Sequence, residues 1–122
     1  MAERRFIIEM GMGLDAQTAD SQKAAARAIE DALGHAALLL FRSAGIDPDG
    51  MRVAVTVGVQ APERLDTGAL AALVPWGRVT VRAVFGGQDV TDPDTGHTIV
   101  VANAAVEAFL PEQGAGWHAA PA

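Results

Sequence analysis

Residues 6–12 read FIIEMGM, and residues 21–43 read SQKAAARAIEDALGHAALLLFRS. In the first stretch, Phe6, Ile8, Met10 and Met12 alternate with a second set of side chains, which is the period of a β-strand. In the second stretch, apolar residues recur at helical spacing opposite a charged side, as in an amphipathic helix; they are Ala25, Ile29, Leu33, Ala36 and Leu40. The sequence therefore predicts a strand and then one long helix, joined by a loop over residues 11–20.

Three further stretches alternate like strands or are apolar throughout, and they cover residues 51–59, 78–85 and 98–110. Asp20 or Ser21 can accept hydrogen bonds at the start of the long helix, and Asp66 can cap a short helix over residues 67–74. Gly86-Gly87 and residues 92–96 supply turn residues. The last two strands are therefore expected to form an antiparallel hairpin.

This element order predicts an α/β (α+β) fold of the form β-α-β-α-β-β, with one domain over residues 1–111 and a flexible tail over residues 112–122. Two helices can cover one face of a four-stranded, mainly antiparallel sheet. The other face, with Thr56, Thr80 and Arg82, then needs another partner. A closed cyclic assembly would cover it, so we expect an oligomer interface there.

The composition excludes several classes of protein. The chain has 122 residues, of which 50% are hydrophobic, and it has no cysteine, which excludes disulfides and thiol nucleophiles. Nine basic and fifteen acidic residues give a net charge of −6, which argues against a nucleic-acid partner. The apolar run at residues 36–41 is far shorter than the roughly 18 residues of a membrane span, and no secretory signal is visible. We expect a cytoplasmic protein that binds neither nucleic acid nor membrane.

The segment between the first strand and the helix holds the first candidate site residues. Gly11-Met12-Gly13 follows a strand and precedes a helix, a context in which backbone N–H groups can approach an anion. The alternative role of these glycines is a strained turn or a subunit contact. Asp15 can act as a general base, although aspartate is also a common turn and cap residue. Lys23 and Arg27 are four residues apart and share a helical face, where they can grip a carboxylate or imide oxygen or can simply be solvated.

Asn103 lies within the apolar stretch at residues 98–110, where a buried amide must be hydrogen-bonded. It can tie down a neighbouring loop or orient a substrate carbonyl. The three histidines lack the spacing of a helical metal site, and Asp89, Asp92 and Asp94 do not follow the register of a calcium loop. We expect no metal and no cofactor.

The stretch IIEMGMGLD, the alanine-rich helix after it and the later stretch VANAAVEAF resemble a small bacterial family of conserved hypothetical proteins. The signature of that family is Gly-x-Gly-x-Asp-x-His-Gly. Gly11, Gly13 and Asp15 match it, whereas Gln17 and Thr18 stand where the signature has His and Gly. The resemblance covers roughly residues 5–110 and implies no particular reaction.

The element order is also similar to one repeat of the cyanuric acid hydrolase and barbiturase fold, in which three repeats surround a pseudo-threefold axis. This resemblance implies that a single repeat assembles as a homotrimer. It also implies a Ser-Lys pair and an Arg in each repeat, but the loop at residues 58–62 has no serine, so the nucleophile of those enzymes is missing. The bacterial chorismate mutase trimer is similar in element order and has its sites between subunits.

Taken together, these features favour a homotrimer that binds a small polar or anionic ligand at the subunit boundary. Asp15 and Lys23 are the catalytic candidates, because no Ser-His-Asp or Cys-His set can be assembled and acid/base chemistry remains. The substrate-binding candidates are Gly11, Gly13, Arg27 and Asn103. The alternatives are a non-catalytic structural trimer and a regulatory binder of small ligands.

Overall fold

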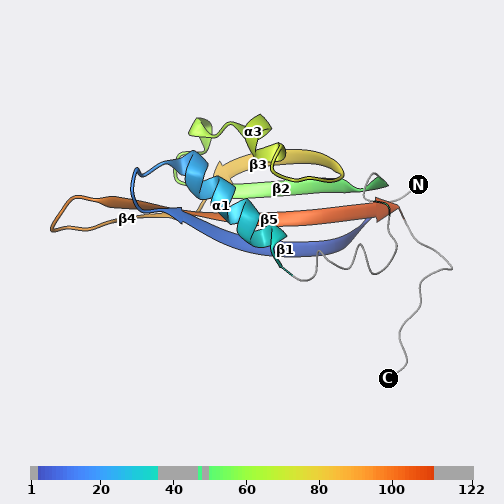
Figure 1. Ribbon diagram of the computed structural model, residues 1–122, viewed down its shortest axis with the longest axis horizontal. Coiled ribbons are helices and arrows are strands. Elements are labelled where there is room, and N and C mark those ends of the chain that lie inside the picture. The colour runs from blue at the N-terminus through green and yellow to red at the C-terminus, as the bar shows by residue number, and fades with distance from the viewer. Residues whose placement is uncertain (1–2, 36–46, 48–49, 112–122) are drawn as a thin grey trace, which may run out of the picture.

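Among the described residues, five strands form one mixed β-sheet, and two α-helices lie on the same face of it (Figure 1). The computed structural model describes residues 3–35, 47 and 50–111. The elements are β1 (Glu3–Asp15), α1 (Ser21–Leu33), β2 (Arg52–Val59), the 3₁₀ turn η3 (Pro62–Arg64), α3 (Thr67–Ala71), β3 (Arg78–Phe85), β4 (Gln88–Thr91) and β5 (Thr98–Pro111). The predicted α+β class is confirmed. The predicted tail lies outside the described residues.

The strand order is β1-β5-β2-β3, with the short β4 paired to the beginning of β5. β5 is antiparallel to each of its neighbours, and β2 is parallel to β3. The sheet is therefore mainly antiparallel, as predicted, but the predicted hairpin between residues 78–85 and 98–110 is wrong. The hairpin is made by β4 and β5. β4 is a fifth strand, which the polar sequence of residues 88–91 did not predict.

Gly86 and Gly87 explain why β3 does not continue into that hairpin. The Gly86 N–H donates to the Val59 carbonyl at 3.0 Å, and Gly87 has a φ of +62°. A Cβ on Gly87 would lie 2.2 Å from the Val101 carbonyl oxygen. The chain thus turns sharply at Gly87, a position that only glycine fits. It then leaves the edge of β2 and pairs with β5.

Helix α1 begins where the sequence predicts but is shorter than predicted. The Asp20 carboxylate accepts from the N–H groups of Gln22 at 2.8 Å and Lys23 at 3.3 Å, which confirms its role as a cap. The helix ends at Leu33, and Gly34 follows as its C-cap. Glycine costs about 1 kcal/mol within a helix, which favours termination there. The remainder of the predicted helix, from residue 36 on, lies outside the described residues.

The core lies between the helices and the sheet. β2 contributes Val53, Val55, Val57 and Val59, and the alternate residues 100–110 of β5 face the same way. Above them α1 buries small side chains: Ala24, Ala25, Ala28 and Ala32 are fully buried. Such short side chains let the helix axis lie close to the sheet. The second helix, α3, is capped by Asp66, whose carboxylate accepts from the Ala69 N–H at 3.0 Å, and buries Leu70.

The closest approach of α1 to the sheet is at two glycines of β1. A Cβ on Gly11 would lie 2.3 Å from the Ala28 carbonyl oxygen, and one on Gly13 would lie 2.3 Å from the Ala28 nitrogen. Any larger residue would push the helix outward. The segment predicted as a loop from residue 11 is therefore strand as far as Asp15, and its glycines form a helix-packing seam.

Within residues 3–35, 47 and 50–111, no helix has both the length and the apolar character that a membrane span requires.

Candidate functional site

Asp15 ends β1 and organises the loop that leads to α1. Its side chain is 2% exposed, and its carboxylate accepts from the Thr18 hydroxyl, from the Asp20 N–H at 2.9 Å and from the Gln17 N–H at 3.3 Å. These hydrogen bonds, with that of Thr18 the strongest, hold the pKa of the Asp15 carboxyl far below its usual range despite burial. The carboxylate is thus a fixed anion that orders the loop.

Arg27 is the cation beside Asp15. Its guanidinium lies 3.6 Å from the Asp15 carboxylate and donates to the Leu14 carbonyl at 2.7 Å. Lys23, one turn earlier on α1, is exposed, and its side chain contacts no carboxylate among the described residues. The structure therefore brings Asp15 together with Arg27, and it leaves Lys23 outside this cluster.

The other predicted ligand-binding residues lie elsewhere. The space above Gly11 and Gly13 is filled by the backbone of α1, so their N–H groups do not line a cradle. Asn103 was expected to be buried, but it is exposed because the side chains of β5 alternate and it falls on the face away from the helices. The six predicted residues thus lie on both sides of the sheet and do not form one site.

The sheet face away from the helices carries a feature that the sequence did not single out. Ile8, Met10, Met12 and Leu14 project from it and are 43% to 61% exposed. We call these four residues the apolar row, and we call the sheet face that bears them the open face. The alternation in β1 was visible in the sequence, but it did not show which set of side chains would be buried.

The register shows what surrounds the apolar row. Met10 lies beside Ala105 of β5. Ala105 pairs with Thr56 of β2, and Thr56 pairs with Arg82 of β3. Met12 lies beside Asn103, which pairs with Gly58. The open face therefore has an apolar strip along β1, small residues in the middle and polar side chains toward β3.

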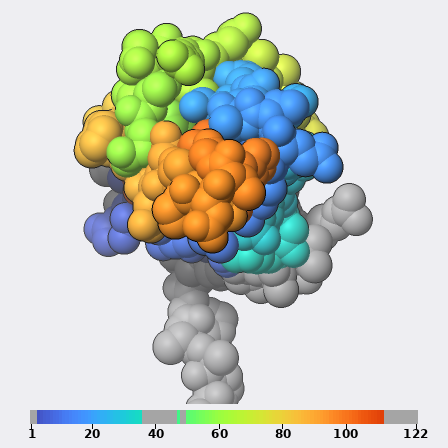
Figure 2. All heavy atoms as spheres, turned by 90° about the vertical axis from the view of Figure 1, so that its left-hand side faces the viewer, coloured from blue at the N-terminus to red at the C-terminus, as the bar shows by residue number. Residues whose placement is uncertain are grey.

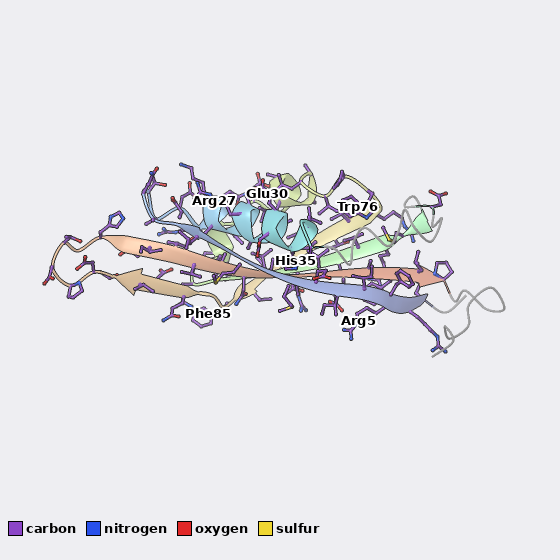
Figure 3. All side chains as sticks on the ribbon, turned by 60° about the horizontal axis from the view of Figure 1, so that its bottom comes forward. Arg5, Arg27, Glu30, His35, Trp76 and Phe85 are labelled. Carbon is purple, nitrogen blue, oxygen red and sulfur yellow. The ribbon has the colours of Figure 1, made fainter. Side chains whose placement is uncertain are left out.

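Charged pairs border one end of the open face. Arg5 bonds to Glu107 at 3.2 Å, and Arg52 bonds to Glu3 at 3.2 Å while stacking over the Phe109 ring at 4.1 Å. In Figure 3 the labelled Arg5 and Phe85 lie on the side of the ribbon away from α1. Phe85 is 74% exposed. An exposed apolar strip with charged pairs at one end is typical of a surface that meets another protein.

On the helix side, one further cluster joins β1 to the end of α1. The His35 imidazole lies 2.9 Å from the Glu9 carboxylate and 4.0 Å from that of Asp31. Asp31 also accepts the Met12 N–H at 2.9 Å. Within the part of the chain that the structure describes, no group of three His, Cys, Asp or Glu side chains has the arrangement of a metal site.

Comparisons with known proteins bear on the family and the fold. The model of a conserved hypothetical protein family, Lin0512, matches residues 5–108. A crystal structure from Nostoc punctiforme, described as an FtsZ-like protein of unknown function, is 34% identical, with a TM-score of 0.78 over 92% of this chain and 99% of that one. No curated protein matches this chain.

Proposed function

We propose that this chain, which belongs to the Lin0512 family of conserved hypothetical proteins, is a self-assembling protein whose copies join through the open face as a homotrimer. The observation that carries the proposal is the apolar row, four exposed large side chains on one strand. The neighbour of known structure is described as FtsZ-like and of unknown function, so it suggests no ligand.

The face of the sheet, and not its edge, supports this assembly. At the edge of β1, Asp31 occupies the Met12 N–H and Arg27 occupies the Leu14 carbonyl, so a second strand cannot add there without displacing them. The face beside that edge has no cover among the described residues. A second copy that packs on it would remove the apolar row from water at about 25 cal/mol for each Å² buried.

A trimer is favoured over other assemblies by the resemblance of this element order to one repeat of the cyanuric acid hydrolase and barbiturase fold. Three copies of a single repeat would take the places of the three repeats in those enzymes. Closed rotational symmetry would then cover every open face in the assembly.

The same face supports a second role, the binding of a small polar molecule where subunits meet. The Asn103 amide and the Thr56 hydroxyl lie on it without a hydrogen-bond partner among the described residues. An amide offers both donors and an acceptor, which suits the carbonyl and N–H groups of an imide, a urea or a carboxylic acid. Binding is better supported than acid/base catalysis, because Asp15 is committed to its loop.

The mass of the protein in solution tests the assembly. Light scattering after size-exclusion chromatography should give three times the mass of the chain, and a Met10→Glu, Met12→Glu variant should give a monomer with unchanged circular dichroism. A matched control, Lys23→Glu with Glu30→Lys, alters two exposed charges on α1 and should remain trimeric. A monomeric wild type would refute the proposal, as would a trimer that survives both methionine substitutions.

A thermal-shift screen of carboxylates, ureas and cyclic imides tests the second role. One chemical class should raise the melting temperature of the wild type, and Asn103→Ala should abolish that shift while it leaves the trimer intact. If no class has an effect, the protein is a structural assembly without a small ligand at this face.

A further inference from the structure

The β4 and β5 hairpin, residues 88–101, projects beyond the layer of helices (Figure 1). Figure 2 looks onto this end, where the hairpin (orange) forms a bulge in front of the other elements. Every residue of β4 is exposed, and Val90 is 46% exposed. Val100 and Val101 also pair with β1, but the remainder of the hairpin is a two-stranded ribbon. Such a ribbon is marginally stable in water, so it gains from a surface to lie on. We call residues 88–101 the hairpin arm.

The hairpin arm is acidic. It carries Asp89, Asp92 and Asp94, and all three are exposed. Asp92 accepts the Asp94 N–H at 2.8 Å within the turn, but none of the three contacts a basic side chain among the described residues. Like charges gathered on a thin projection repel one another, and a basic partner would relieve that repulsion.

A basic pair without acidic partners lies on β3. Arg78 and Arg82 are exposed and, with Thr80 between them, follow the alternation that places them on one face of the strand. Parallel pairing sets Arg78 beside Arg52 and Arg82 beside Thr56, which belong to the open face. Neither Arg78 nor Arg82 contacts a carboxylate within the described part of the chain.

The acidic arm and the start of β3, which holds Arg78, lie at opposite ends of the same molecule (Figure 1). β4 pairs with the first residues of β5, Thr98 to Val101, whereas Arg78 aligns through Arg52 with Phe109 near the other end of β5. The arm of one chain therefore cannot reach the start of its own β3. The arm and Arg78 can meet only between copies.

We propose that the acidic hairpin arm of one copy docks on the Arg78 and Arg82 side of the open face of the next copy. This inference rests on the proposed self-assembly and adds the segment that sets its geometry. The contact joins two different surfaces. Repeated head to tail around an axis, it closes a ring such as a trimer, whereas in a two-fold dimer the same contact would form twice, reciprocally.

Charge reversal tests this contact. One variant carries Asp89→Arg and Asp94→Arg, with Asp92 kept because it bonds within the turn; a second carries Arg78→Glu and Arg82→Glu; a third carries all four changes. Each two-residue variant places like charges against each other, which should raise the dissociation constant of the assembly by at least about tenfold. The four-residue variant restores opposite charges with their positions exchanged, so it should recover most of the wild-type assembly.

The control variant carries Glu30→Arg and Glu63→Arg, which change the net charge as much as the arm variant does but lie on α1 and η3. It should assemble like the wild type. Light scattering over a dilution series, at low and at high salt, supplies the dissociation constants, and the effect of each reversal should shrink at high salt. Circular dichroism melts check that every variant is folded.

Two outcomes would overturn the inference. In the first, neither two-residue variant raises the dissociation constant of the assembly. In the second, the four-residue variant assembles as weakly as two independent two-residue changes would predict. If the wild type is trimeric and only the Met10 and Met12 substitutions dissociate it, the arm contact fails while the proposed function stands. If the wild type itself is monomeric, both fail.

Discussion

The backbone N–H of Met12, on the outer edge of β1, donates to the Asp31 carboxylate of α1 across 2.9 Å. One helical turn away, Arg27 donates to the Leu14 carbonyl at 2.7 Å. The helix thus supplies a donor and an acceptor where a neighbouring strand would otherwise do so. Side chains therefore occupy the edge of β1 at Met12 and Leu14, which favours the open face as the surface for assembly.

Removal of Asp31 should open this edge. Asp31→Ala leaves the Met12 N–H without its partner, and because the pair is solvent-exposed we expect a loss of only about 1 kcal/mol in the free energy of unfolding. We also expect more aggregation on storage, since a free strand edge pairs with other chains. Urea unfolding and light scattering measure the two effects, and Glu30→Ala, one position earlier, should show neither. Equal behaviour of the two variants would contradict the proposed role of Asp31.

The glycine seam between β1 and α1 should not tolerate a methyl group. In Gly13→Ala the new Cβ would lie 2.3 Å from the Ala28 nitrogen and 2.5 Å from the Ala24 carbonyl oxygen, which are backbone atoms that cannot rotate away. We expect a loss of about 1–3 kcal/mol or more, as is usual for overpacking. Gly50→Ala is the control, because a Cβ there meets nothing within 4 Å. Equal urea midpoints for the two variants would show that α1 does not need this close approach.

Asp15 should make stability depend on pH. Its pKa in the folded protein is lowered by the hydrogen bonds from Thr18, Asp20 and Gln17, so the ionised carboxylate stabilises the fold above the ordinary carboxyl pKa of about 4. That stabilisation is lost as the pH falls below this value. Asp15→Asn should therefore melt below the wild type at pH 7, and the gap should narrow toward pH 3.

Thr18→Val is the companion variant, because it removes only the hydroxyl donor and keeps the carboxylate. It should lose a smaller part of the stability at pH 7. A constant gap between wild type and Asp15→Asn at every pH would mean that the charge of Asp15 does not contribute.

The turn that starts the hairpin arm should require glycine for two separate reasons. Gly87 has a φ of +62°, and a Cβ on it would also lie 2.2 Å from the Val101 carbonyl oxygen. Gly96, at the tip of the arm, has a φ of +74° and open space around it. Gly96→Ala should therefore cost only the conformational strain, about 1–2 kcal/mol, whereas Gly87→Ala should cost more because the clash adds to it. Thermal unfolding of both variants measures the difference, and an equal loss would argue against the clash.

Local features of the fold were predictable from short stretches of sequence. Asp20 and Asp66 cap helices as predicted, since a cap depends on a carboxylate and the next few N–H groups. The alternation at residues 52–59 and 78–85 placed both strands. The length of α1 was overestimated, because the apolar pattern continues past Gly34 while the helix does not.

The candidate site was less predictable, because its residues meet only through the tertiary structure. Asp15 and Arg27 were both selected from the sequence, and the structure joins them, but in a loop-ordering contact. Asn103 was selected for its rarity within an apolar strand, yet the register of β5 places it on the open face. The proposed function depends on the apolar row. From the sequence alone, these residues were predicted only to form one side of a strand.

By itself, the sequence determined the order of every described element but β4, together with the helix caps, because these depend on neighbours a few residues apart. Only the tertiary structure decided which face of β1 is covered. Hydrophobicity favours burial of the side that bears Met10 and Met12, but Gly11 and Gly13 on the other side let the alanine face of α1 approach to contact distance. Within one chain, the close packing of α1 on β1 stabilises the fold more than burial of the larger side chains would. Those side chains therefore stay exposed, and a second chain can bury them.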